Sequence, residues 1–244
     1  MPPILEYLAV VRRLGGRPVL DGFTLSIAEG ETVALVGPSG SGKTTALKLA
    51  NRLLEPDSGE VRVFGEPAAS QDPIRLRRGV GWVIQEGGLF PHWTVEENVS
   101  AVPRLLGWPP GKRRERALAL LESVGLPAAD FARRRPGELS GGQRQRVGVA
   151  RALAAEPRLV LMDEPFGALD PPSRRAIQEE FRGWRTRLRA AVLFVTHDVG
   201  EAFLLADRVA VLAGGNVRQV GTPDELRRRP VDELVRGFLA GSSS

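Results

Sequence analysis

The sequence predicts an α/β fold with a helical insert. Short, uninterrupted apolar runs at 159–162 and 191–195 are typical of buried parallel strands. The stretch 172–188 between them is long enough for the helix that crosses over between two such strands. Residues 89–155 instead have a helical pattern that proline interrupts repeatedly. We therefore expect an α/β core, formed by both ends of the chain, around a mainly helical middle.

The first third of the chain predicts two strands that lead through a loop into a helix. The strands are expected at 21–28 and 31–36, joined across Glu29-Gly30. A glycine-rich loop at 37–42 follows the second strand directly. The helix after the loop would have an apolar face made of Ala46, Leu47, Ala50, Leu53 and Leu54.

Three more strands and a helical tail are expected from the same patterns. One strand is predicted at 60–64, and two others at 208–212 and 217–220, on either side of a glycine pair. The tail 223–239 is expected to be helical.

These elements predict one domain over residues 1–244. Its core would comprise about 1–88 and 156–222, with a helical subdomain at about 89–155 and a C-terminal helical tail at about 223–244.

Composition narrows the class of protein. Of 244 residues, 42% are hydrophobic, which is enough for a substantial core and excludes a disordered chain. There is no cysteine, so disulfides and thiolate metal sites are excluded. No uncharged apolar run approaches the roughly 18 residues of a membrane span, and the N-terminus lacks the pattern of a secretory signal. We expect a soluble cytoplasmic protein. The net charge is +5, but the basic residues are spread along the chain and are accompanied by 29 acidic residues, so no nucleic-acid partner is expected.

One stretch matches the phosphate-loop pattern G-x-x-x-x-G-K-[ST] without a gap. Glycines allow the backbone to wind so that its N–H groups surround phosphate oxygens, and the helix that follows adds its positive dipole end. Lys43 would reach the β- and γ-phosphates, and the Thr44 hydroxyl would bind Mg²⁺. The residues expected to contact nucleotide are Gly37, Pro38, Ser39, Gly40, Ser41, Gly42, Lys43, Thr44 and Thr45.

Two carboxylates follow the apolar run at 159–162. Open α/β sheets bind ligands at the carboxyl ends of their strands, where Asp163 and Glu164 stand. Asp163 would hold Mg²⁺ through water, and Glu164 would orient or deprotonate the attacking water. Alone, such a pair is more often a solvated strand end, but the upstream phosphate loop favours catalysis. His197 ends another apolar strand and could donate a hydrogen bond to a γ-phosphate oxygen. No catalytic role is expected for His92.

A second helix start is also suited to phosphate. Ser140 is a good N-cap, and the two glycines after it permit a ligand to approach closely. Because one loop already surrounds the nucleotide, this second anion receptor is explained if each of two copies presents it to the ATP of the other. The alternative is an ordinary capped helix.

In combination, these motifs resemble the nucleotide-binding domain of ABC transporters over nearly the whole chain. Residues 37–44 are similar to that family's Walker A motif, 159–164 to Walker B and 139–143 to the signature. The resemblance implies a RecA-like P-loop NTPase core with an antiparallel β subdomain and an inserted α-helical subdomain. It also implies ATP and Mg²⁺ as cofactors.

The resemblance assigns further roles. Gln85 is similar to the Q-loop glutamine, implied to sense Mg²⁺ and the γ-phosphate, and Asp170 and His197 to the D-loop aspartate and the switch histidine. The implied contacts to the partner's nucleotide are Ser140, Gly141, Gly142 and Gln143. The family usually has an aromatic residue stacked on adenine where this chain has Leu14, so weaker nucleotide binding is expected. Tyr7 and Phe23 are expected in the core rather than as substitutes.

The resemblance also implies partners. Residues 89–99 lie where such subunits contact the coupling helix of a membrane permease, and Trp82, Phe90 and Trp93 could anchor it, or else simply pack the insert. This stretch is similar to importers of glycine betaine or choline, as are residues 102–109 and 221–226. Import of polar amino acids stays open. Many such subunits carry CBS domains after the core. The sequence ends at Ser244, so osmotic gating through them is not expected.

The expected assembly is a homodimer in complex with permease subunits and a substrate-binding protein, at the cytoplasmic face of the membrane. A competing class comprises soluble ABC ATPases that act on nucleic acid or ribosomes. Those commonly have two cores or a long coiled-coil insert, and this sequence has neither. A non-hydrolysing regulatory module conflicts with the presence of Glu164 and His197.

Overall fold

The computed structural model describes residues 3–85, 88–167, 171–188 and 190–241. The chain divides into two compact units, one made of residues 1–77 and 190–244 and the other of residues 78–189. Each unit is described by itself. The second unit contains the whole stretch 89–155 that was expected to be helical, and in addition two strands and a long helix.

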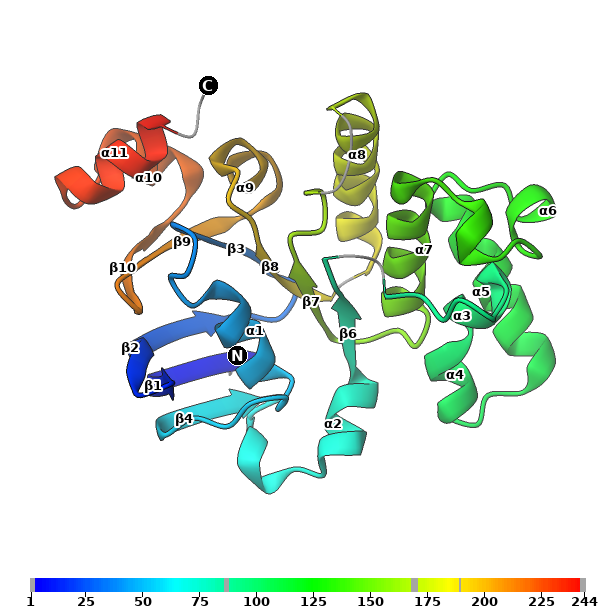
Figure 1. Cartoon of the computed structure of the whole chain (residues 1–244), viewed down its shortest axis with the longest axis horizontal. Helices are drawn as coiled ribbons and strands as arrows, with labels where there is room; N and C mark the ends of the chain where they lie inside the picture. The colour runs from blue at the N-terminus through cyan, green and yellow to red at the C-terminus, as the bar shows by residue number, and fades with distance from the viewer. Residues whose placement is uncertain (1–2, 86–87, 168–170, 189, 242–244) are drawn as a thin grey trace. The chain divides into compact units, whose positions relative to one another are not determined.

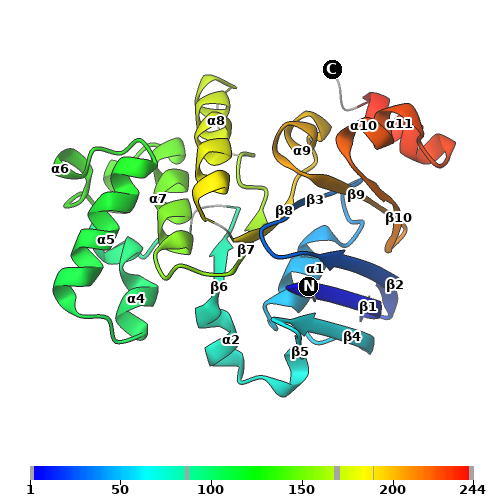
Figure 2. The same cartoon turned by 180° about the vertical axis from the view of Figure 1, so that it is seen from behind.

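The first unit contains an antiparallel sheet. Its strand order is β2-β1-β4-β5, where β1 is Leu5–Leu14, β2 Arg17–Ile27, β4 Ser58–Val63 and β5 Glu66–Pro67. Figure 2 shows these strands side by side. The register pairs Leu5 with Ile27 on one side and with Val63 on the other. Leu5, Ile27 and Val63 are buried, so the sheet contributes one face to the core. This is the antiparallel subdomain that the resemblance implied.

The same unit contains a group of mainly parallel strands. β3 (Thr32–Val36) lies between β8 (Ala191–Val195) and β9 (Arg208–Ala213) and is parallel to both. β10 (Asn216–Gly221) pairs with β9 in the antiparallel direction. Every residue of β3 and β8 is buried. For β8 the uninterrupted apolar run at 191–195 predicted this burial.

Helices complete the first unit. They are α1 (Lys43–Ala50), the 3-10 helix η1 (Ala68–Ser70), α9 (Val199–Leu205), α10 (Pro223–Arg228) and α11 (Glu233–Gly241). The expected helical tail is therefore two helices with a break between them. α2 (Pro73–Gly79) begins in this unit and runs into the second.

In the second unit, helices pack against two parallel strands. β6 (Val80–Val83) pairs with β7 (Leu159–Asp163), and α7 (Gly141–Leu153) packs against β6. The packing is close, because a Cβ atom added at Gly81 would lie 2.6 Å from the Ala152 carbonyl oxygen. The remaining helices, green to yellow in Figure 1, are α3 (Val95–Val99), α4 (Ala101–Leu105), α5 (Pro110–Ser123), α6 (Ala128–Phe131), the 3-10 helix η2 (Pro136–Glu138) and α8 (Pro171–Leu188).

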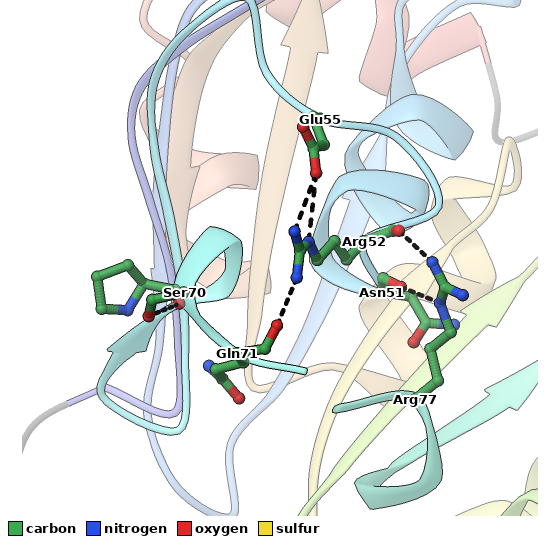
Figure 3. Close-up of polar contacts among 7 residues, drawn as sticks. Asn51, Arg52, Glu55, Ser70, Gln71 and Arg77 are labelled. Carbon is green, nitrogen blue, oxygen red and sulfur yellow. Dashed lines mark hydrogen bonds and ion pairs between the residues drawn. The ribbon is translucent and has the colours of Figure 1, made fainter. Parts of the chain in front are cut away.

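The first helix is shorter than predicted, so the prediction was wrong for the C-terminal end of its apolar face. α1 ends at Ala50, and Leu53 is 50% exposed. Arg52 has the positive φ of 50°, which no α-helix allows. The Arg77 guanidinium donates to the carbonyl oxygens of Asn51 at 3.2 Å and Arg52 at 2.5 Å, so it satisfies acceptors at the helix end (Figure 3). Arg52 in turn bonds to Glu55 and to the Gln71 carbonyl oxygen.

Within the described ranges, no helix combines the length and the apolarity that crossing a bilayer requires.

Candidate functional site

The phosphate-loop sequence connects β3 to α1, as the sequence predicted. At Gly37 an added Cβ atom would lie 2.1 Å from the Leu212 carbonyl oxygen, so β9 leaves room for glycine only. Gly42 is the N-cap of α1 and has a φ of 103°. A Cβ atom there would lie 2.7 Å from the Val19 carbonyl oxygen. Sterics therefore require glycine at two positions of the motif.

The loop carries positive charge that no acidic side chain of its helix opposes. Lys43 is 7% exposed, and its Nζ atom donates to the carbonyl oxygens of Gly37 at 2.8 Å and Pro38 at 2.9 Å. The first turn of α1 contains no acidic residue. Ser41 is also buried, and its Oγ atom has no hydrogen-bond partner within the described part of the chain. A buried, unsatisfied hydroxyl beside a cation and a helix start is suited to an anion.

Asp163 and Glu164 lie at the carboxyl end of β7, as predicted. Asp163 is the last residue of the strand and is 9% exposed. Glu164 is half-buried and has the positive φ of 44°, a strained conformation for a residue other than glycine. Such strain costs about 1–3 kcal/mol and persists only where the surrounding structure enforces it.

Gln85 contacts Glu164 within the second unit. Gln85 lies two residues beyond β6, and its Nε2 atom donates to Glu164 Oε2 at 3.0 Å. The adjacent parallel strands β6 and β7 bring together two side chains that are 79 residues apart. This hydrogen bond holds one carboxylate oxygen of Glu164 in a defined place.

Ser140 is the N-cap of α7, which confirms the prediction made for it. Its Oγ atom accepts from the Gln143 N–H at 3.2 Å, and Gln143 Oε1 accepts from the Ser140 N–H at 2.9 Å. The helix begins at Gly141, and its first turn has no acidic residue. The capping box leaves the positive end of the dipole unopposed. Ser140 and Gly141 are exposed, and Gly142 is half-buried.

His197 is exposed in the short connection between β8 and α9, in the first unit. Leu14 ends β1, is 43% exposed, and precedes a turn of two glycines with positive φ. Tyr7 and Phe23 are fully buried with ring centroids 4.9 Å apart, so both belong to the core as predicted. Asp170 lies outside the described residues.

The expected Mg²⁺ ligands belong to different units. Thr44 is in the first unit, and Gln85 and Asp163 are in the second. By residue type, a hydroxyl, an amide and a carboxylate each offer an oxygen donor, the kind of ligand that Mg²⁺ takes together with phosphates. Among the described residues, no cluster of three or more histidine, aspartate or glutamate side chains could hold a metal by itself.

The aromatic residues near Gln85 lie in different surroundings. Phe90 is 47% exposed and lies against Trp93, with ring centroids 4.5 Å apart and the rings tilted by 37°. Trp82 is half-buried in β6. Sequence reasoning missed Asn98, which is fully buried and orders this loop. Its Oδ1 atom accepts from the Phe90 N–H at 2.7 Å, and its Nδ2 atom donates to the Phe90 and Thr94 carbonyl oxygens at 3.1 and 2.9 Å.

Residues 20–167 match the protein-family model described as "ABC transporter". The chain belongs to the ABC transporter family. A solved ABC structure supports the fold: a dimeric ATP-binding cassette in a post-hydrolysis state, bound to ADP and phosphate, has a TM-score of 0.80 and 34% sequence identity. The similarity covers 90% of this chain and 98% of that one. The predicted fold class, a RecA-like P-loop NTPase core with added subdomains, is thus confirmed.

Curated ABC relatives are named as ATP-binding proteins of transport, import or uptake systems. The glycine betaine/carnitine/choline transport ATP-binding protein OpuCA of Bacillus subtilis is 53% identical over 96% of this chain and 61% of its own length. The osmoprotectant import protein OsmV of Salmonella typhimurium is 48% identical over 92% and 59%. The glycine betaine uptake protein YehX of Escherichia coli is 44% identical over 98% and 77%. This ABC chain therefore spans about three fifths of the first two relatives.

Proposed function

We propose that the chain is the ATP-binding and ATP-hydrolysing subunit of an ABC importer. The observation that carries the proposal is Glu164, whose carboxylate follows a buried strand, sits on a strained backbone and is oriented by Gln85. A carboxylate held in this way can accept a proton from an attacking water. Membership of the ABC family and a phosphate loop that requires glycine at two positions support ATP as the substrate.

In the proposed reaction, the loop 37–44 binds the triphosphate through its N–H groups and through Lys43. Glu164 takes a proton from water while the water oxygen bonds to the γ-phosphorus. The bond between that phosphorus and the β–γ bridging oxygen breaks, and ADP and phosphate leave. Lys43 and the His197 ring stabilise the charge that gathers on the γ-phosphate oxygens. Thr44, Gln85 and Asp163 would hold Mg²⁺, which supplies neutralisation of phosphate charge.

The dimer belongs to the same proposal. The positive start of α7, with Ser140, Gly141, Gly142 and Gln143, would contact the γ-phosphate bound by the partner copy. Two observations support it: the unopposed dipole of α7 and the dimeric state of the similar solved cassette. Nucleotide binding would close the dimer and hydrolysis would reopen it.

A membrane permease is the proposed partner, with a substrate-binding protein as a further component. The exposed Phe90 beside Trp93, ordered by Asn98, offers an apolar anchor for a helix of the permease. A neighbouring cleft of about 430 Å³ between α3, α4 and α5 is lined by Glu96, Glu97, Ser100, Arg104, Pro110, Gly111, Arg113 and Arg114. With a membrane permease as its partner, the chain would act at the cytoplasmic face of the membrane.

The proposed cargo is an osmoprotectant of the glycine betaine or choline type. The support is kinship alone, because three similar relatives carry names of this class. Cargo would contact the permease and the binding protein rather than this chain. Co-purification with permease subunits, followed by cargo-stimulated ATP turnover, tests both the partner and the cargo.

The catalytic proposal is tested by Glu164→Gln, which keeps the shape of the side chain and removes its basicity. We expect ATP turnover to fall by at least about 100-fold, the lower end of what a general base contributes. ATP should still bind and hold the protein as a dimer in size-exclusion chromatography. Glu115→Gln, on an exposed face of α5, is the matched control and should leave turnover unchanged. Unchanged turnover of the Glu164 variant would refute the assignment.

A further inference from the structure

The N-terminus of α9 is capped differently from three other helix starts of this chain. In α3, α7 and α10 the third helical residue reaches back and accepts directly from the N–H of the N-cap residue. These are ordinary capping boxes. In α9 the N-cap is Asp198 and the third helical residue is Glu201, so the same box would be possible. The structure shows a different arrangement.

A threonine hydroxyl is inserted into the α9 cap. The Asp198 N–H donates to Thr196 Oγ1 at 3.0 Å, and that hydroxyl donates to Glu201 Oε2 at 2.7 Å. Asp198 Oδ1 accepts from the Glu201 N–H at 3.1 Å, which completes the ring of contacts. A relay of three residues therefore replaces the direct bond between N-cap and carboxylate.

The relay is buried, unlike the ordinary caps. Thr196 is 2% exposed and Glu201 is 6% exposed, whereas Thr94 is half-buried and Thr222 exposed. Burial of a carboxylate is costly unless it is hydrogen-bonded, and the Thr196 hydroxyl supplies such a bond to Glu201. The difference indicates that this cap does more than end a helix.

The residue that the relay encloses is His197. Thr196 and Asp198 flank it, and the hydrogen bond between them closes the backbone on either side of the histidine. The Thr196 N–H also donates to the Leu35 carbonyl oxygen at 3.3 Å. Leu35 pairs with Val195 in the parallel β3–β8 ladder, and β3 leads directly into the phosphate loop. We call residues 196–198 the His197 arch. Through the bond to Leu35, this arch is fixed to β3, the strand that leads into the phosphate loop.

We propose that Thr196 and Glu201 are positioning residues that hold His197 at a fixed place relative to the phosphate loop. The inference rests on the proposed function, in which His197 contacts the γ-phosphate. Thr196 acts through its hydroxyl, which donates to the carboxylate and accepts from the backbone at the same time. A histidine on an unbraced turn would sample other positions and stabilise the transition state less often.

The test compares Thr196→Val, Thr196→Ala and Thr196→Ser with Thr222→Val, which removes the N-cap hydroxyl of the ordinary capping box of α10. Steady-state ATP turnover, the dissociation constant of ATP and the melting temperature are measured for each. We expect the first two variants to lose about tenfold or more in kcat, because misplacement of a group near the reacting atoms reduces rate steeply. ATP affinity should hardly change. Thr196→Ser should restore turnover, and Thr222→Val should lower only the melting temperature.

Two outcomes overturn the inference. One is a kcat of Thr196→Val and Thr196→Ala equal to that of Thr222→Val, because the relay would then be structural only. The other is a Thr196→Ser variant as slow as Thr196→Val, because the hydroxyl would not be the determinant. Failure of the proposed function looks different: either the unmodified chain would not hydrolyse ATP, or Glu164→Gln and His197→Ala would both leave turnover intact.

Discussion

Gly42 and Gly40 allow the steric and backbone requirements of the phosphate loop to be separated. Both glycines have positive φ, 103° and 77°, so an alanine at either position adopts a conformation that costs about 1–2 kcal/mol. Around Gly40 no atom lies within 4 Å of an added Cβ. At Gly42 the added atom would lie 2.7 Å from both the Val19 carbonyl oxygen and Leu20 Cδ2. Only Gly42→Ala therefore adds overpacking, worth about 1–3 kcal/mol.

We expect Gly40→Ala to lower the free energy of unfolding by about 1–2 kcal/mol, and Gly42→Ala by about 2–5 kcal/mol. Urea denaturation of both variants without nucleotide measures the difference. Because β2 would have to move away from the start of α1, Gly42→Ala should also raise the KM for ATP more than Gly40→Ala. Equal losses of stability in the two variants would refute the steric reasoning.

Two further predictions concern nucleotide affinity and pH. Leu14→Tyr should tighten ATP binding by about 0.5–1.5 kcal/mol, the worth of aromatic stacking, and an unchanged dissociation constant would contradict a contact between this side chain and adenine. Hydrogen bonds from the Thr94 backbone and side chain lower the pKa of Glu97, so its contribution to stability is present above the ordinary glutamate pKa and is lost as pH falls through the lowered one. Melting temperatures of the unmodified chain and of Glu97→Gln should therefore converge on acidification; a constant difference would disprove the linkage.

Local patterns predicted much of the fold because they report on burial. The runs at 159–162 and 191–195 became strands β7 and β8, in which every residue is buried. The phosphate loop was also predictable, since its glycines and lysine are consecutive in the chain. Ser140 was predictable as an N-cap because capping is a contact between neighbours in sequence.

Elements that depend on distant partners were missed or misplaced. The helix expected to include Leu53 ends at Ala50. Just beyond that end, Arg77 donates to the carbonyl oxygens of Asn51 and Arg52, and Arg77 is 25 residues away from Arg52 in the sequence. β6 was not expected as a strand, and it is ordered by pairing with β7. Asn98 gave no signal as the residue that orders the Phe90 loop, because its role consists of tertiary hydrogen bonds to backbone.

The sequence by itself determined the chemistry of this protein, since the phosphate loop, the paired carboxylates and the histidine are each recognisable from residue type, order and the apolar runs that precede them. Only the tertiary structure decided which groups orient one another. Gln85 donates a hydrogen bond to Glu164 because β6 and β7 pair. Glu201 accepts one from Thr196, beside His197, because of the way in which α9 is capped. Periodicity records which side chains are buried; it does not record which buried polar groups face each other.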